Sequence, residues 1–198
     1  HAALLSGGLA LAALLGSFML GIAVFLFVFF YLVLNVAYSL SFRHAPIADM
    51  MSVAVGFVLR VATGIAAVAA PYSPWILSTT FFFALFLVAA KRRLELGLTH
   101  GAAGRGALRA YTPEFLDQIL IGAFSLTLAV FVAYAFLEAK SAWFPLAIVP
   151  VSFGMTRFLL TVRAGHTDTD DHLTLFFRDR WLFASVILFA IFSLASNI

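Results

Sequence analysis

The chain has 198 residues, of which 64% are hydrophobic and only 11% are charged, and its mean hydropathy is +1.07. A soluble domain is nearer half apolar and about a quarter charged, so this composition excludes a soluble globular protein and indicates lipid as the solvent. The absence of cysteine excludes a disulfide framework and a thiolate metal site. We interpret the net charge of +3 as a sign of membrane topology, and we expect no nucleic-acid partner.

Seven apolar segments divide the chain, each near the length that crosses a bilayer core of roughly 30 Å. Helices are expected because lipid forces each segment to satisfy its own backbone groups, and the runs are too long and too uniformly apolar for barrel strands. We therefore predict an all-α, multi-pass transmembrane helical bundle that forms one domain over residues 1–198. The predicted segments are Leu4–Gly16, Met19–Tyr38, Ile47–Ala70, Trp75–Ala90, Phe115–Leu137, Trp143–Val162 and Trp181–Ala195.

Prolines mark several of these segments. Pro74 and Pro113 each follow a side chain that can cap a helix, which predicts a helix start at both prolines. Pro46 is expected to open the third segment in a similar way. Pro150 lies inside the sixth segment, where its missing backbone donor is expected to kink the helix. A tight join is expected between the first two segments at Gly16-Ser17.

Basic residues alternate along the joins between segments. The joins 39–46, 91–113 and 163–180 carry 9 of the 12 Lys and Arg residues, whereas the alternate joins contribute only Lys140. The positive-inside rule predicts this asymmetry, so we expect a protein of the inner (plasma) membrane with its charged joins in the cytoplasm. The opposite joins are too short to form a site, and we therefore expect an active site that faces the cytoplasm.

Arg60 is a charge within an apolar segment. It lies about thirteen residues inside the third segment, where a charge is costly and usually faces a polar cavity. Asp49, Gly56 and Arg60 are spaced by seven and four residues, which places them on one helix face. One interpretation is a polar cleft in which Arg60 holds an anionic group. The alternative is a structural ion pair, or an arginine that binds carbonyl groups of a neighbouring helix.

Further polar residues cluster at the ends of the segments. Lys91-Arg92-Arg93, with Glu95, either anchors the topology and contacts lipid headgroups or cradles phosphate. Tyr38 ends its segment, where tyrosine is common as an interface anchor, and Asn35 lies one turn earlier on the same face. Arg157 lies near the end of the sixth segment and can extend toward the interface. An acidic run either binds a metal or is a solvated loop; it comprises Asp168, Asp170 and Asp171.

Motifs over nearly the whole chain resemble a known family. They are Tyr38-Ser39, Arg43-His44, Asp49, Gly56-Phe57, Arg60, Gly64, Pro71, Ser73, Trp75, Lys91-Arg92, Glu95-Leu96, Tyr111-Thr112, Arg157 and Leu175 with Arg178-Asp179-Arg180. Together they resemble the decaprenyl-phosphate phosphoribosyltransferases of the UbiA superfamily of intramembrane prenyltransferases. The portion from Tyr38 to Leu96 is the specific part, because the flanking segments match mainly in hydropathy.

The resemblance implies a UbiA-like bundle of nine helices, of which the seven segments here correspond to the third through the ninth. The first two helices and the first aspartate-rich motif, which binds magnesium in the family, are expected upstream of His1. No metal ligands are therefore expected in this chain, and the chain alone is expected to be inactive. The second aspartate motif of the superfamily is also absent, and Lys91-Arg92-Arg93-Leu94-Glu95 stands at about its place, as in the phosphoribosyl branch.

The implied reaction moves 5-phosphoribose from phosphoribosyl pyrophosphate to a polyprenyl (decaprenyl) phosphate, with Mg²⁺ as cofactor and release of pyrophosphate. The resemblance implies Tyr38, Asp49 and Arg60 as catalytic residues, with the first two orienting the ribose or a metal-bound water. The residues expected to bind substrate phosphates are Arg43, His44, Lys91, Arg92, Glu95 and Arg157.

Two other functions are compatible with the same sequence. A UbiA-type prenyltransferase would use the same cleft to join a prenyl diphosphate to an aromatic acceptor. A multi-pass transporter or scaffold would not be an enzyme, and Arg60 would then be a counter-ion for a transported substrate. Transporters often show two related halves, and the chain shows no such symmetry.

Overall fold

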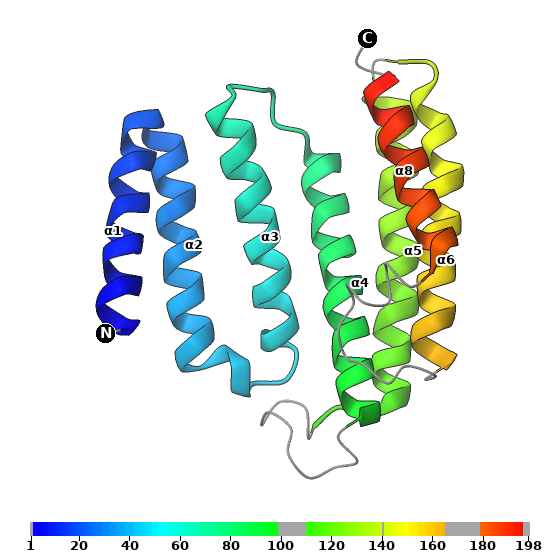
Figure 1. Cartoon of the computed structure of the whole chain (residues 1–198), viewed down its shortest axis with the longest axis horizontal. Coiled ribbons are helices and arrows are strands. Elements are labelled where there is room, and N and C mark those ends of the chain that lie inside the picture. Colours follow the sequence, from blue (N-terminus) through cyan, green and yellow to red (C-terminus); the bar gives the residue numbers. More distant parts are fainter. Residues whose placement is uncertain (1, 99–109, 140, 165–178, 196–198) are drawn as a thin grey trace.

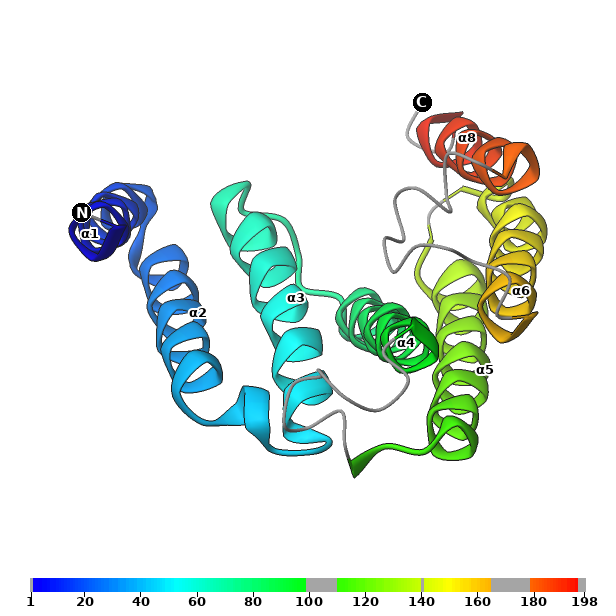
Figure 2. The ribbon, with the colours of Figure 1, turned by 60° about the horizontal axis from the view of Figure 1, so that its bottom comes forward.

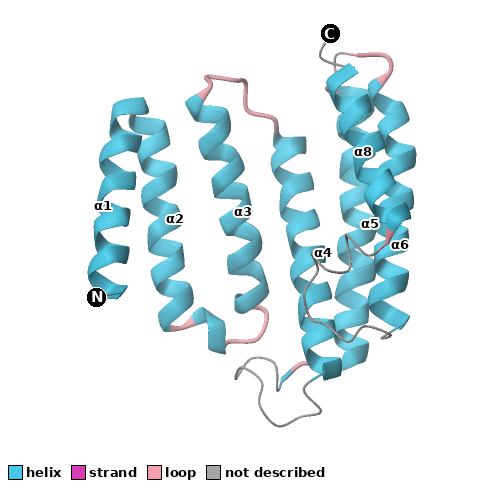
Figure 3. Cartoon of the chain, viewed as in Figure 1, coloured by secondary structure: helices cyan, strands magenta, loops and turns pink. Residues whose placement is uncertain are grey.

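A computed structural model describes residues 2–98, 110–139, 141–164 and 179–195 of the chain. These residues are mostly helical and contain no strand (Figure 3), which confirms the predicted all-α bundle. The α-helices are α1 (Ala2–Leu20), α2 (Ile22–Leu40), α3 (Ala48–Ala67), α4 (Pro74–Leu98), α5 (Pro113–Leu137), α6 (Ile148–Ala164) and α8 (Arg180–Ala195), and the short 3-10 helices are η1 (Phe42–His44) and η3 (Phe144–Ala147).

Five stretches of the described chain are long and apolar enough to cross a membrane. They are Ile22–Leu40, Ala48–Ala67, Pro74–Gly97, Pro113–Leu137 and Phe144–Ala164. Two further apolar stretches, Ser6–Leu20 and Arg180–Ala195, are shorter. These lengths agree with a multi-pass membrane protein.

The helices form an open, curved row (Figure 2) in which most helices pack against their neighbours in sequence. Successive helices run in opposite directions, so the joins alternate between two ends of the molecule (Figure 1). The link between α2 and α3, the end of α4 and the start of α5 share one end, which we call the lower end after its place in Figure 1. The alternation matches the predicted grouping of charged joins.

The core lies between α3, α4, α5, α6 and α8. Phe86 of α4 is buried at its centre, with ring centroids 5.6 Å from Phe158 and 6.3 Å from Phe124. Small side chains such as Ala54 and Ala89 are fully buried and let helix backbones approach each other closely. Many large apolar side chains are exposed, as lipid-facing helix surfaces require.

Two predicted helix starts are confirmed by their caps. Pro74 is the first residue of α4, and the preceding Ser73 accepts the backbone N–H of Ile76 through Oγ at 3.1 Å. Pro113 begins α5 in the same way, because Thr112 Oγ1 accepts the N–H of Phe115 at 3.2 Å. In both cases proline stands where its missing N–H costs nothing.

The join predicted at Gly16-Ser17 is wrong. Helix α1 continues to Leu20, and the chain turns at Gly21 with φ 127°. Glycine reaches this backbone region at no steric cost, whereas Ser17 is held in the helix with its hydroxyl donating to the carbonyl of Leu14 at 2.8 Å.

The roles expected for two other prolines also differ. Pro46 does not open α3, which begins at Ala48 after Ile47 turns the chain with φ 67°. Pro150 is the third residue of α6, because the preceding segment forms the separate 3-10 helix η3. A proline in the first helical turn breaks no internal hydrogen bond, so Pro150 accompanies a helix start and not the predicted kink within a helix.

Candidate active site

Four of the predicted site residues meet at the lower end as one hydrogen-bonded group, the Asp49–Arg92 network. The carboxylate of Asp49 accepts Arg92 Nε at 2.6 Å and Nη2 at 3.0 Å. It also accepts the hydroxyl of Tyr38 at 3.0 Å. Glu95 completes the network by accepting Arg92 Nη1 at 2.7 Å. The network therefore joins the last turn of α2, the first turn of α3 and the end of α4.

Both charged side chains of the Asp49–Arg92 pair are buried. Asp49 is 0% exposed and Arg92 is 3% exposed. Removing two charges from water is expensive, and only close pairing with further hydrogen bonds compensates for it. Two parallel bonds from the guanidinium fork supply that geometry here. The charge of Arg92 is already balanced in the structure, and three of its nitrogen atoms have a partner.

The link between α2 and α3 is held by a tyrosine from the chain before α5. Tyr111 Oη accepts the backbone N–H of Ile47 at 2.7 Å. Ile47 has φ 67°, which is strained for a β-branched residue. Tyr111 is buried and stacks on Phe115 with a centroid distance of 6.0 Å, and burial raises the pKa of its phenol. The phenol therefore stays protonated at neutral pH while it accepts this bond.

Other predicted phosphate-binding residues remain accessible at the lower end. Arg43 and His44 lie in η1 and are exposed, and Lys91 is exposed beside Arg92 on α4. Arg93 instead joins α4 to α5 through Asp117, with Nε 3.1 Å from Oδ1. The lower end therefore combines a buried, neutralised ion pair with exposed basic side chains.

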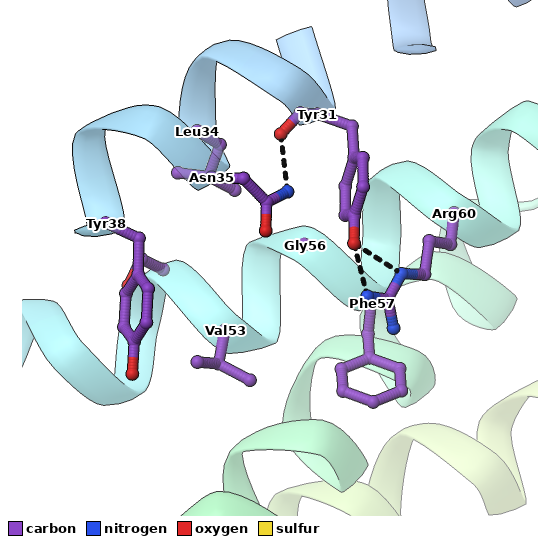
Figure 4. A pocket seen from close by; sticks show the side chains of 9 residues that line it. Tyr31, Leu34, Asn35, Tyr38, Val53, Gly56, Phe57 and Arg60 are labelled. Atoms are coloured by element: carbon purple, nitrogen blue, oxygen red, sulfur yellow. Dashed lines mark hydrogen bonds between the residues drawn. The ribbon is translucent and has the colours of Figure 1, made fainter. Parts of the chain in front are cut away.

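A cavity of about 150 Å³ lies between α2 and α3 (Figure 4). Arg60 of α3 faces Tyr31 of α2 there, and its Nε donates to Tyr31 Oη at 3.1 Å while its Nη2 donates to the same oxygen. The guanidinium carbon lies 4.9 Å from the Tyr31 ring centroid and 5.1 Å from that of Phe57. The lining residues are Tyr31, Leu34, Asn35, Tyr38, Ser52, Val53, Gly56, Phe57 and Arg60.

Residues of the predicted polar face of α3 lie in two different environments. Gly56 and Arg60 line the cavity, whereas Asp49 is bonded to Arg92 of α4. Asp49 and Arg60 are eleven residues apart, or about 16 Å along the helix axis. Tyr38 links the two regions because it lines the cavity and donates to Asp49.

Arg157 pairs with a different partner. Its Nε lies 2.7 Å from Asp179 Oδ2, and Asp179 also accepts the backbone N–H of Trp181 at the start of α8. Burial, the largest single effect, works against ionisation of Asp179, but the bond and charge of Arg157 and the backbone N–H groups of Trp181 and Leu182 together outweigh it and lower the pKa of that carboxyl. Arg157 thus anchors α8, and its side chain is still 46% exposed.

The described residues contain no group of three or more His, Cys, Asp or Glu that could hold a metal ion. Asp49 and Glu95 are both bonded to Arg92, and Asp117 is bonded to Arg93. The carboxylates in this part of the chain are thus engaged with arginine or apart from one another. The acidic run with a possible metal role lies outside the described residues; it comprises Asp168, Asp170 and Asp171.

Sequence reasoning did not select two of these residues. Tyr31 precedes Asn35 and Tyr38 by four and seven residues, so all three share one face of an apolar helix. That polar stripe was a usable signal for the partner of Arg60. Asp117 had no such signal, because its contact with Arg93 depends on how α5 packs against α4.

The chain is similar in sequence to several known proteins of one name. No protein-family model matches the chain. The chain is 28% identical over 178 residues to a decaprenyl-phosphate phosphoribosyltransferase of Mycobacterium tuberculosis, covering 88% of this chain and 58% of the relative. Proteins of the same name match from Corynebacterium glutamicum, at 28% over 162 residues (78% of this chain, 49% of the relative), and from Mycolicibacterium smegmatis, at 27% over 191 residues (90% and 59%).

The chain thus spans between 49% and 59% of the length of these curated relatives. The matched region covers most of this chain, including the helices that build the network and the cavity. These matches support the resemblance carried by the motifs, and over most of its length the chain is similar to the decaprenyl-phosphate phosphoribosyltransferases.

Proposed function

We propose that the protein is an integral membrane transferase of the UbiA type that moves 5-phosphoribose from phosphoribosyl pyrophosphate to a polyprenyl phosphate. The observation that carries the proposal is the lower end of the bundle. There the exposed side chains of Arg43, His44 and Lys91 share one end of the molecule with a buried ion pair. The names of the similar proteins supply the acceptor class and the transferred group.

The reaction exchanges one bond at the anomeric carbon of ribose. The bond from this carbon to the pyrophosphate oxygen breaks, and its electron pair leaves with pyrophosphate. A new bond forms from the same carbon to an oxygen of the lipid phosphate. The acceptor is already ionised, so no general base is required, but both partners are anions and need fixed positive charge to meet.

Each group at the lower end has a place in this proposal. Arg43, His44 and Lys91 bind phosphate groups, because they are basic and accessible. Asp49 fixes the hydroxyl of Tyr38, which orients the ribose. The buried Arg92 maintains this arrangement through Asp49 and Glu95.

Magnesium belongs to the proposal because a divalent ion supplies charge neutralisation to a pyrophosphate leaving group when it is bound. The carboxylates of the described residues do not form a set that fits the ion. We therefore assign no step to magnesium, and its ligands would come from other parts of the protein.

The proposal is tested with membranes that contain the product of the complete coding sequence. Magnesium, radiolabelled phosphoribosyl pyrophosphate and a polyprenyl phosphate are supplied, and label in the lipid extract is counted. We expect label that depends on the lipid phosphate and falls at least tenfold in Lys91→Gln, since a charge-assisted bond is worth roughly 1.5–3 kcal/mol. Arg163→Gln, at the end of α6, is the matched control and retains activity.

Absence of lipid label would contradict the proposal. If the same membranes instead consumed a prenyl diphosphate with an aromatic acceptor, the protein would be a general UbiA-type prenyltransferase. Neither activity, with the protein folded and present, would favour the transporter or scaffold.

A further inference from the structure

Arg60 differs from three other arginines of the helices in how its charge is compensated. Arg92, Arg93 and Arg157 each pair with a carboxylate. Among the described residues no ion pair involves Arg60, and the oxygen that accepts its two hydrogen bonds is the neutral phenol of Tyr31. A neutral acceptor and two aromatic faces stabilise the cation but leave it without a counter-charge.

The position of Arg60 makes this incomplete compensation notable. It is the thirteenth residue of α3, about 18 Å along the helix from its lower end. A charge at such depth in a membrane-spanning helix is expensive and usually serves a ligand, an ion or a proton. An anion that entered the cavity would supply the missing counter-charge.

The cavity has room for such an anion. Its volume of about 150 Å³ is well above the roughly 10–15 Å³ that one water molecule needs, so a compact polar group such as a phosphate fits. Asn35 and Tyr38 add polar groups to the wall, while Leu34, Val53 and Phe57 keep much of the lining apolar.

We infer that the cavity between α2 and α3 is a binding site for a phosphate monoester. In the absence of ligand the hydroxyl of Tyr31 accepts the hydrogen bonds of Arg60, and a bound phosphate replaces that hydroxyl as the acceptor. A phosphate presents paired anionic oxygens that match the planar guanidinium fork, whereas the phenol offers one neutral oxygen. The phosphate is therefore the stronger acceptor and displaces Tyr31 Oη.

The identity of the ligand rests on the proposed function, which provides two phosphate monoesters. One is the phosphate of the polyprenyl acceptor, and the other is the 5-phosphate of the ribosyl donor. Tyr38 connects the cavity to the Asp49–Arg92 network, so either phosphate would lie on the same path as the exposed basic groups of the lower end. The chemistry at Arg60 is the same for both sources.

Two substitutions separate the roles of the paired residues. Tyr31→Phe keeps the ring under the guanidinium but removes the competing oxygen, so binding no longer requires displacement. When only a fraction of the protein has Arg60 free of Tyr31, the apparent affinity for phosphate is reduced by that fraction. Removing the Tyr31 hydroxyl is therefore expected to tighten phosphate binding about three- to tenfold. Arg60→Gln removes the charge and is expected to weaken binding about ten- to a hundredfold.

The experiment measures equilibrium binding by the full-length protein in detergent micelles. The probes are radiolabelled polyprenyl phosphate, radiolabelled phosphoribosyl pyrophosphate and, without a phosphate, polyprenol. Tyr72→Phe is the matched control, because Tyr72 packs against Phe27 of α2 but does not line the cavity. Where Arg60→Gln does not fold, Arg60→Lys keeps the charge, loses the fork and is expected to weaken binding about tenfold.

Opposite shifts in Tyr31→Phe and Arg60→Gln for one phosphate probe, with Tyr72→Phe and polyprenol binding unchanged, support the inference. A shift confined to the lipid probe assigns the site to the acceptor, and one confined to the soluble probe assigns it to the donor. Equal affinities in all variants, or no binding of either phosphate probe, overturn it. Binding without ribosyl transfer by the wild-type protein would instead overturn the proposed function.

In the transfer assay the same variants are expected to change KM for the assigned substrate more than kcat. Tyr31→Phe lowers this KM, whereas a purely structural role of the Tyr31 hydroxyl would predict lower protein stability with KM unchanged.

Discussion

Asp49 accepts three hydrogen bonds from two side chains while none of its surface is exposed. Its place on one helix face with Gly56 and Arg60, and the family resemblance, marked it as a candidate site residue. The sequence did not reveal its partners, because Arg92 lies 43 residues further along the chain. The same holds for Arg60 and Tyr31, which are 29 residues apart. Spacing finds residues on one helix face, whereas packing decides which neighbouring helix that face meets.

At this scale we predict that Asp49→Asn strongly destabilises the protein. The neutral side chain would leave the buried Arg92 with Glu95 as its one anionic partner in the network. Removing one member of a buried ion pair typically costs about 3–5 kcal/mol. Thermal unfolding of the detergent-solubilised protein measures the loss. Glu114→Gln, at an exposed position in the first turn of α5, is the control, and equal melting temperatures for both variants would contradict the prediction.

At the scale of elements, close helix contacts depend on small residues. Gly154 of α6 faces Ser185 of α8, and a Cβ atom at residue 154 would lie 3.2 Å from Ser185 Cβ and still closer to its Oγ. Both residues are buried. This contact sets how closely α6 and α8 approach, as small residues do between membrane helices.

We therefore predict that Gly154→Ala destabilises the α6–α8 pair by about 1–3 kcal/mol through overpacking. Adding Ser185→Ala removes the nearest contact atom and is expected to restore part of this loss. Gly122→Ala is the control, because nothing lies within 4 Å of a Cβ atom added at Gly122. Unfolding in detergent measures all three variants. A double variant no more stable than Gly154→Ala would show that Ser185 Oγ is not the obstacle.

The start of α8 gives a prediction for pH. Burial opposes ionisation of Asp179, but the bond and charge of Arg157, together with the backbone N–H groups of Trp181 and Leu182, outweigh it, and the pKa of Asp179 is lowered. A carboxyl with a lowered folded-state pKa adds stability above its unfolded pKa of about 3.9, and this stability is lost as the pH falls through the folded value. Because Arg157 is half exposed, the gain is expected to stay below about 1 kcal/mol.

Asp179→Asn tests this by removing the charge while keeping a side chain that can cap a helix. At pH 7 the wild-type protein is expected to melt at a higher temperature than the variant. The difference is expected to shrink once the pH falls below about 4. A difference that stays constant down to pH 3 would attribute the effect to packing and not to the charge.

At the scale of the whole molecule, the two ends of the bundle differ in chemistry. The lower end carries the Asp49–Arg92 network and the exposed Arg43, His44 and Lys91. Three helices, α3, α4 and α5, separate the link after α2 from the join after α5, and these joins lie at opposite ends of the molecule (Figure 1). We propose that the lower end faces the cytoplasm, where basic joins are retained.

The chain contains no cysteine, so single cysteines report this topology cleanly. We predict that Ala142→Cys reacts with a membrane-impermeant maleimide in cells whose wall and outer layers have been removed but whose inner membrane is intact. Ser41→Cys is expected to react only after the membrane is permeabilised. Both positions are exposed in the structure. If both cysteines were labelled from the same side, α3, α4 and α5 could not each cross the membrane between them. If only Ser41→Cys were labelled from outside, the orientation would be the reverse of the proposed one.

The sequence by itself determined the fold class and the approximate helices, because lipid requires long apolar segments whose lengths and flanking charges are local properties of the chain. Local chemistry also predicted the starts of α4 and α5 from Ser73-Pro74 and Thr112-Pro113. Only the tertiary structure showed that Arg92 is neutralised by Asp49 and Glu95 while Arg60 is left with a phenol. The reason is physical: the partner of a charge is set by which helices pack together and at what height, and neither is encoded in the periodicity of one segment.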